Sequence, residues 1–328
     1  MPKCALADAV FLEGQALAPL EEQAPAPSRK ISHSFSTTHR WTGIMTLTTP
    51  SRPIKSQLWV NLSGSLLLLF LGLLVSFPFL WMIRTSLLKE TDAPKFPPIW
   101  IPDYFILDSY IGALTIQPFA RYLANSLFIA LLAVLTQLLT ASLGAYAFAR
   151  LRFPGRDKLF LLYLATMLIP GQVTMIPTYV LISRLGWVDS YMGLIAPGMF
   201  NVFITFLLRQ FFLSIPLELE DAAKIDGAGY LRTYATIIMP LSKPALATAS
   251  IFIFTGSWGS FLWPLLLIRT RELRTVPLGL AAMQLEQGHT NIPQLMAGST
   301  MAIVPIILVF LLLQRYYIEG VALTGLKG

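Results

Sequence analysis

Six long stretches of this sequence contain no Asp, Glu, Lys or Arg, and they set the strongest limit on its fold. The charged residues that bound them are Lys55 and Arg84, Arg121 and Arg150, Lys158 and Arg184, Asp189 and Arg209, Lys243 and Arg269, and Glu286 and Arg315. Each stretch is about 20 residues or somewhat longer, which is the length that an α-helix needs to cross roughly 30 Å of hydrocarbon. Strands of a membrane barrel would be about half as long and would alternate in polarity. The sequence therefore predicts an all-α membrane protein with six transmembrane helices.

The composition and the placement of basic residues agree with this interpretation. Hydrophobic residues make up 55% of the chain and charged residues 12%, with a mean hydropathy of +0.64. Basic residues are denser before Arg84, in the segments 150–158 and 209–243, and near the C-terminus than in the alternate segments. Because such residues accumulate on the cytoplasmic side, we expect both termini and the segment 214–243 to be cytoplasmic. The net charge of +7 thus indicates membrane topology rather than nucleic-acid binding.

Residues 1–55 differ from the rest of the chain and are predicted to be a disordered N-terminal extension. They are rich in Ala, Pro, Ser and Thr and show no sustained helical or strand period. Met45 is a candidate for the true start, in which case residues 1–44 would not be translated, and a real but flexible tail is the alternative. Residues 56–328 are expected to form the transmembrane domain.

Several kinds of chemistry are not expected of this chain. Cys4 is the only cysteine and the three histidines are scattered, so neither an intramolecular disulfide nor a metal site is predicted. The predicted spans hold no ionisable side chain in their interiors, which argues against an ion-coupled carrier and against a membrane protease. No glycine-rich loop ending in Gly-Lys-Ser/Thr occurs. The chain is therefore predicted not to be an enzyme, and any nucleotide that drives it must bind to another chain.

Neutral polar and aromatic residues inside the spans are candidates for a solute path. Amides and hydroxyls would hydrogen-bond an uncharged polyhydroxylated solute, and rings would stack on sugar faces. The candidates are Gln172, Thr174, Tyr179, Asn201, Thr205 and Trp258. Packing between membrane helices is the alternative role for each of them. Proline and glycine interrupt the third and fourth spans at Pro170-Gly171 and Pro197-Gly198, where a kink is expected.

The polar segment 214–243 is too long for a simple connection between two spans. Ser214 is a candidate cap and Pro216 suits the first turn of a helix that ends at Asp226-Gly227. A second short helix is predicted from about Tyr230 to Met239, stopping at Pro240. This helix-turn-helix either docks on a soluble partner or lies as an amphipathic hairpin on the membrane surface.

The residues of this segment also carry a resemblance to a known family. Asp221-Ala-Ala-x-x-Asp-Gly-Ala228, followed by Ile237-x-x-Pro240, resembles the "EAA" loop of binding-protein-dependent ABC importer permeases. Asp221 stands where that family usually has Glu, and Glu220 is a possible substitute. The segments 96–102, 121–126 and 315–328 resemble the carbohydrate branch of the family, the maltose-type second permease. The resemblance as a whole covers nearly all of residues 55–328.

The resemblance implies the type I importer fold and a set of partners. The partners are a second permease, two cytoplasmic ATP-binding subunits that use ATP and Mg, and an extracytoplasmic binding protein that meets the outer loop 269–293. The implied location is the plasma membrane of a bacterium or archaeon. No cofactor is expected on this chain.

The implied cargo is a sugar, and the implied contact with the ATPases is the loop within 214–243. The residues expected to couple the chain to the ATPases are Glu220, Asp221, Ala222, Ala223, Asp226, Gly227, Ala228 and Pro240. The tail 325–328 is a second expected ATPase contact. Two alternatives remain, namely a permease of the same family for glycerol phosphate or another polar solute, and a stand-alone carrier.

Overall fold

The computed structural model describes residues 54–116, 118–285 and 291–325, and these residues form helices and turns without a β-strand. The expectations for the N-terminal extension, for Met45 and for residues 326–328 fall outside these ranges. The chain divides into two compact units, Met1–Leu62 and Ser63–Gly328. Of the first unit, the structure describes only the first turns of α1.

Three helices are each long and apolar enough to cross a membrane. They lie within α1 (Ile54–Ser86), α3 (Phe119–Arg150) and α14 (Ile292–Gly325). Three pairs of helical segments also satisfy this criterion when each bent pair is taken together: 156–184 with a bend of 96°, 191–214 with a bend of 45°, and 230–258 with a bend of 80°. The described residues thus hold three candidate spans, or up to six if each bent pair is one span.

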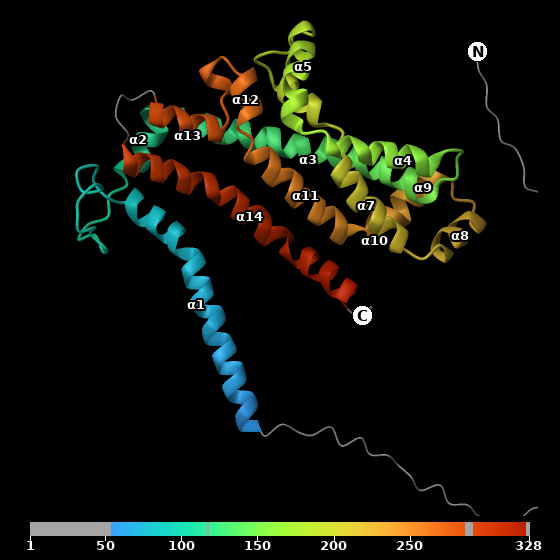
Figure 1. The fold of residues 1–328 in the computed structure, drawn as a ribbon, viewed down its shortest axis with the longest axis horizontal. Coiled ribbons are helices and arrows are strands. Elements are labelled where there is room, and N and C mark those ends of the chain that lie inside the picture. Colours follow the sequence, from blue (N-terminus) through green and yellow to red (C-terminus); the bar gives the residue numbers. More distant parts are fainter. Residues whose placement is uncertain (1–53, 117, 286–290, 326–328) are drawn as a thin grey trace, which may run out of the picture. The chain divides into compact units, whose positions relative to one another are not determined.

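The remaining elements, including those that make up the bent pairs, lie between α1 and α14 in the chain (Figure 1). They are α2 (Asp108–Ile116), α4 (Arg156–Ala165), α5 (Gly171–Arg184), α6 (Tyr191–Ile195), α7 (Val202–Ser214), α8 (Glu218–Ile225), α9 (Tyr230–Thr233), α10 (Met239–Leu241), α11 (Lys243–Trp258), α12 (Leu262–Leu267) and α13 (Val276–Leu285). Single turns η1 (Thr166–Leu168), η2 (Ala196–Gly198) and η4 (Arg271–Leu273) and the π-helical turn η3 (Tyr234–Ile238) connect some of them. The prolines of the segment 96–102 keep it out of regular helix.

Helix α3 is central to the packing and contacts α7, α11 and α13. Its alanines, among them Ala141 and Ala145, are buried in one cluster with Leu208 and Phe212 of α7. Small side chains let membrane helices approach closely, which explains why this seam forms on the alanine-rich face. A second cluster joins the start of α3 to α11, α13 and α14.

The chain breaks at both of the expected proline–glycine pairs. The chain bends between η1 and α5 at Pro170, and between η2 and α7 after Pro197-Gly198. Pro305 lies inside α14 without ending it. The fifth predicted span is interrupted at Gly259-Ser260, ahead of Pro264, which lies within α12. At two of these breaks a residue has extended backbone, namely Ile169 and Asn201.

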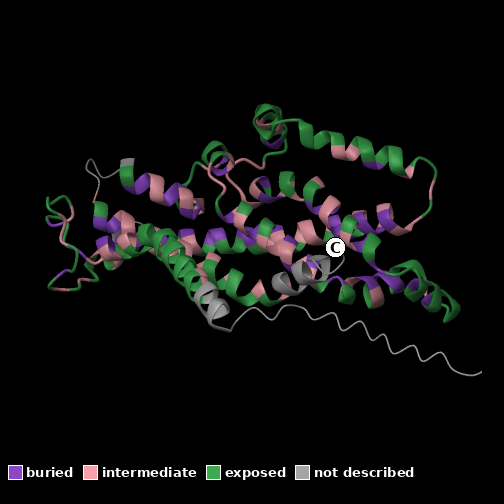
Figure 2. Ribbon diagram, turned by 60° about the horizontal axis from the view of Figure 1, so that its bottom comes forward, coloured by how far each residue is buried: buried purple, intermediate pink, exposed green. Residues whose placement is uncertain are grey.

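Apolar side chains along α1 from Leu62 onward are exposed, as Figure 2 shows in green for this helix. Leu68 is 71% exposed and Val75 is 67% exposed. A helix with this surface requires an apolar environment, so lipid or another chain must cover it.

Candidate functional site

The segment 214–243 forms two helical pieces between α7 and α11, with boundaries close to those expected. The first, α8, carries Glu218, Glu220 and Asp221 in its first turn, where the positive end of the helix dipole favours negative charge. Ser214 does not cap it, contrary to expectation. Its hydroxyl instead donates to Phe211 O at the end of α7, and Leu217 takes the N-cap position.

The C-terminus of α8 has the hydrogen bonds of a Schellman motif. Gly227 has φ +77°, Ala228 N donates to Ala223 O over 2.8 Å, and Gly227 N donates to Lys224 O over 3.0 Å. This left-handed conformation is the one that glycine adopts without steric cost. The turn at Asp226-Gly227 that the sequence predicts is therefore present.

The second helical piece extends from Tyr230 through Leu241 and contains the π-helical turn η3. Pro240 does not end it, because the helix continues one residue further. A proline lacks the N–H for the bond to the preceding turn, and its ring crowds the carbonyl four residues earlier. A widened turn directly before Pro240 relieves that crowding, which explains why the helix passes through this residue.

A buried ion pair attaches α8 to the end of α3. Arg150 Nε lies 2.8 Å from Glu220 Oε1, and the two side chains are only 3% and 5% exposed. The same guanidinium donates through Nη2 to Phe212 O at 2.5 Å and to Ile215 O at 2.6 Å. One side chain thereby joins the C-termini of α3 and α7 to α8.

Tyr234 makes a second attachment between this segment and α3. Its hydroxyl lies 2.7 Å from Ser142 Oγ in a buried hydrogen bond, and its ring packs against Tyr146. The two attachments lie on different helical pieces of the segment. Both pieces are therefore fixed to α3.

The candidate coupling residues do not all face outward. Glu220 and Ala223 are buried against this chain, so neither can directly meet a separate subunit in this conformation. Four others are exposed, namely Asp221, Ala222, Asp226 and Gly227, as is Pro240, whereas Ala228 is half-buried. Glu220 therefore cannot stand in for Asp221 as an exposed carboxylate.

The exposed face of the segment combines charge with large apolar side chains. Asp221 Oδ1 accepts a hydrogen bond from Lys224 Nζ over 2.9 Å, which raises the pKa of Lys224. Ile225 is 87% exposed and Leu231 is 74% exposed, next to exposed Tyr230. Apolar groups of this size on a polar element are typical of a surface that binds a partner or a membrane.

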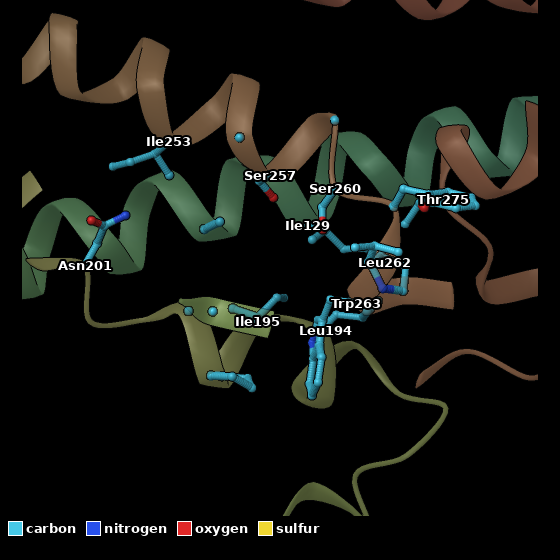
Figure 3. Close-up of a pocket in the computed structure, with 18 of the residues that line it drawn as sticks. Ile129, Leu194, Ile195, Asn201, Ile253, Ser257, Ser260, Leu262, Trp263 and Thr275 are labelled. Atoms are coloured by element: carbon cyan, nitrogen blue, oxygen red, sulfur yellow. The ribbon is translucent and has the colours of Figure 1, made fainter. Parts of the chain in front are cut away.

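A pocket of about 820 Å³ lies among α3, the broken segments around α5 and α6, and the α11–α12 junction (Figure 3). Gln137 of α3 and Asn201 lie side by side in its wall, with Asn201 Nδ2 donating to Gln137 Oε1 at 2.9 Å. Asn201 Oδ1 in turn accepts from Ile204 N and caps α7. The chain breaks therefore supply polar groups to the wall of the pocket.

Three of the six candidate solute-path residues line this pocket, namely Gln172, Thr174 and Asn201. Tyr179 does not line it, and its hydroxyl accepts from Arg269 Nη2 at 3.3 Å. Thr205 is buried and donates to Asn201 O at 2.9 Å. Trp258 is buried, stacks on Phe254 and donates to Ala302 O. The last two residues therefore have packing roles in this chain.

Sequence reasoning missed Gln137, Trp263 and Arg150. Gln137 lies in the middle of a charge-free stretch, which was the available signal for a pocket residue. Trp263 enters the pocket only because the chain breaks before α12. Arg150 was interpreted as a topology signal, because nothing local indicates that its partner lies 70 residues later (at Glu220).

Over the described ranges, no three side chains among His, Cys, Asp and Glu gather in a way that could hold a metal ion.

Comparison with known proteins gives consistent matches. A family model described as "Binding-protein-dependent transport system inner membrane component" matches residues 138–322. The arabinooligosaccharides transport system permease protein AraQ of Halalkalibacterium halodurans is 36% identical over 262 residues, covering 79% of this chain and 94% of that protein. The sn-glycerol-3-phosphate transport system permease protein UgpE of Brucella abortus is 33% identical over 273 residues, covering 80% of this chain and 96% of that protein.

Solved structures show the same similarity. A chain of a bacterial ABC transporter involved in the import of the acidic polysaccharide alginate aligns with a TM-score of 0.71 at 25% identity, covering 82% of this chain and 100% of that chain. A chain of a bacterial alginate ABC transporter in complex with a pentasaccharide-bound periplasmic protein aligns with a TM-score of 0.57 at 16% identity, covering 79% and 94%. The second similarity concerns the fold alone.

Proposed function

This chain belongs to the family of inner membrane components of binding-protein-dependent transport systems, and from that premise we propose that it is the permease subunit of an ATP-driven sugar importer. The single observation that carries the proposal is the exposed face of α8, held on α3 by the buried Arg150–Glu220 pair. Such a rigid polar projection can enter a groove on a soluble partner.

The membrane domain of the proposal has six spans with both termini in the cytoplasm. The three single spans and the bent segments support this count, with 156–184 and 191–214 as the third and fourth spans. For the fifth span we take 243–268, which places α9 and α10 in the cytoplasm with α8. The basic residues of 150–158 and 209–243 support that side for the segment.

Coupling in this proposal occurs through α8 and the following turn. Asp221, Ala222, Asp226 and Gly227 offer exposed surface to a cytoplasmic ATPase subunit, and Ile225 adds apolar area. Glu220 acts through Arg150 as a positioning residue. When the ATPases close, displacement of α8 would be transmitted to the ends of α3 and α7, because the Arg150 guanidinium bonds to both.

The proposed partners are a second permease, two ATP-binding subunits that bind ATP and Mg, and an extracytoplasmic solute-binding protein. The exposed apolar surface of α1 supports contact with lipid or with the second permease. The loop 269–293, which contains η4 and α13, is the proposed contact for the binding protein. Pro240 and Ala228 shape the segment rather than contact the ATPase.

Cysteine cross-linking of the assembled transporter tests the proposal. Cys4 would first be replaced by Ser, so that an introduced Ile225→Cys is the only thiol. We expect it to cross-link to an ATPase subunit. Phe96→Cys is a matched control, because Phe96 is 94% exposed and follows the first span on the extracytoplasmic side of the proposed topology, so it should capture no ATPase. An intact assembly in which Ile225→Cys captures no ATPase would contradict the proposal.

The similarity to UgpE keeps glycerol phosphate as a second candidate cargo. A stand-alone carrier is a separate alternative and has a simple test. Solute uptake into vesicles that contain this chain alone would contradict the subunit proposal and support a stand-alone carrier. Uptake that requires the ATPases would support the subunit proposal.

A further inference from the structure

The pocket between α3 and the α11–α12 junction contains only uncharged residues in its wall, although it is large. Its volume of about 820 Å³ lies within the range of small-molecule sites in proteins, roughly 300–1,000 Å³. Every residue that lines it, from Ser126 to Thr275, is neutral. The ion pairs Lys95–Asp92, Arg150–Glu220 and Arg156–Asp157 all lie outside this wall.

Some polar groups of the wall remain available after folding. Gln137 accepts from Asn201 through Oε1, and in the described part of the chain its Nε2 has no hydrogen-bond partner. The exposed Gln172 side chain likewise makes no hydrogen bond to described residues. Amide groups of this kind match the donors and acceptors of sugar hydroxyls.

Aromatic surface accompanies these polar groups. Phe252, which is 50% exposed, and Trp263 both line the pocket, and Figure 3 labels Trp263 with Ser257, Ser260 and Asn201 around the same space. The Trp263 indole N–H is bonded to Gly193 O, which fixes the ring. A fixed ring with an apolar face can pack against the C–H face of a sugar.

From these observations we infer that the pocket is a solute-binding site within this permease and that it selects neutral sugars over phosphorylated or acidic ones. The inference rests on the proposed importer function and specifies its substrate class. A phosphate or carboxylate placed here would lose hydration without meeting a cation, which is costly in a low-dielectric site. A neutral sugar would replace its water contacts with the free amides.

Uptake by the complete assembly of permeases, ATPases and binding protein in vesicles tests the inference. The probes are arabinotriose as a neutral sugar, sn-glycerol 3-phosphate as a phosphorylated solute and an alginate trisaccharide as an acidic sugar. We expect import of the neutral probe alone. Gln172→Leu should raise the KM for this probe about fivefold, the effect of losing one hydrogen bond, with the maximal rate unchanged.

Two further variants separate solute binding from packing. Gln172 makes no bond within the described chain, so Gln172→Leu should leave the thermal unfolding temperature unchanged, whereas Gln137→Leu also loses the bond to Asn201. Thr136→Val is the matched control, because the Thr136 hydroxyl donates to Leu132 O of its own helix and does not line the pocket. It should leave KM unchanged.

Import of either anionic probe at a rate comparable to the neutral one would overturn the inference, as would an unchanged KM in Gln172→Leu. Failure of the importer proposal itself is detected separately, by the absence of the cross-link from Ile225→Cys to an ATPase. An intact cross-link together with import of an anion would overturn the pocket inference alone.

Discussion

Arg150, the last residue of α3, and Glu220, in the first turn of α8, form a buried ion pair with 2.8 Å between Nε and Oε1. Their burial distinguishes this pair from the exposed Asp221–Lys224 pair one residue away. An exposed pair contributes little to stability, whereas a buried charge that loses its partner is costly. Four predictions test this and three other relationships.

Replacing Glu220 by Gln should destabilise the protein by about 3–5 kcal/mol, because the Arg150 guanidinium would remain buried with its charge uncompensated. Thermal unfolding of the purified assembly, followed by tryptophan fluorescence, measures the loss. Asp221→Asn is the matched control and should change stability by less than about 1 kcal/mol. Equal unfolding temperatures for Glu220→Gln and the wild type would disprove the structural role of the pair.

Gly227→Val should uncouple ATP hydrolysis from uptake while membrane insertion remains intact. Gly227 has φ +77°, and a Cβ there would meet no atom within 4 Å, so the cost comes from the backbone alone. That cost is about 1–2 kcal/mol for a residue with a side chain. Gly229→Val is the control, because Gly229 has φ −76° and equally open surroundings. Parallel assays of ATPase activity and uptake would show the difference, and normal uptake in Gly227→Val would contradict a coupling role.

Asp189 should stabilise the link between α5 and α12 in a pH-dependent way. Burial raises the pKa of Asp189, but the N–H groups of Thr270 and Arg269 and the Thr270 hydroxyl outweigh it, so the folded-state pKa is lowered. The contribution is therefore complete above the unfolded-state pKa of about 3.9 and is lost as the pH falls through the lower folded-state value.

Asp189→Asn isolates this charge, since Asn also tolerates the φ of +58° found here. The wild type should unfold at a higher temperature than Asp189→Asn at neutral pH, and the difference should shrink below about pH 4. A difference that stays constant from neutral pH to pH 3 would show that the charge is not involved.

Asn125→Leu should loosen the segment 271–276. Asn125 Nδ2 donates to Glu272 O and Arg274 O at 2.8 and 2.9 Å, and its Oδ1 accepts from the Tyr191 hydroxyl. Removing these bonds should cost about 1–3 kcal/mol. Hydrogen exchange of the amides in 271–276 is the measurement. Tyr191→Phe removes one of the three bonds and should have a smaller effect, so equal exchange rates in both variants would contradict the role of Asn125.

The local features of the segment 214–243 were largely predictable from the sequence. The Asp226-Gly227 turn is present because the glycine supplies the left-handed conformation that neighbouring residues would resist. Ser214 was wrongly expected to cap α8, because its hydroxyl can equally serve the preceding helix. Which helix end a serine caps depends on the chain path and not on the residue.

The candidate pocket residues were predictable only in part, for a related reason. Gln172, Thr174 and Asn201 follow or adjoin the proline–glycine breaks, and those breaks place them at the wall. Thr205 and Trp258 belong to the same residue classes but contact neighbouring helices, through Tyr163 of α4 and Ala302 of α14. Composition gives the chemical groups available, and helix rotation decides which of them reach the pocket.

The sequence by itself determined the apolar lengths that require helices, the breaks at Pro170 and Pro197, and the turn at Gly227, because each depends on the chemistry of adjacent residues. Only the tertiary structure decided that Glu220 faces Arg150, that Asp221 faces solvent, and that Gln137 meets Asn201. The Gln137–Asn201 and Arg150–Glu220 contacts join residues that are 64 or more positions apart. The neighbouring carboxylates of Glu220 and Asp221 differ only in which way the folded chain turns them. Nothing in the local backbone specifies such partners, because they follow from how α3, α7 and α8 pack together.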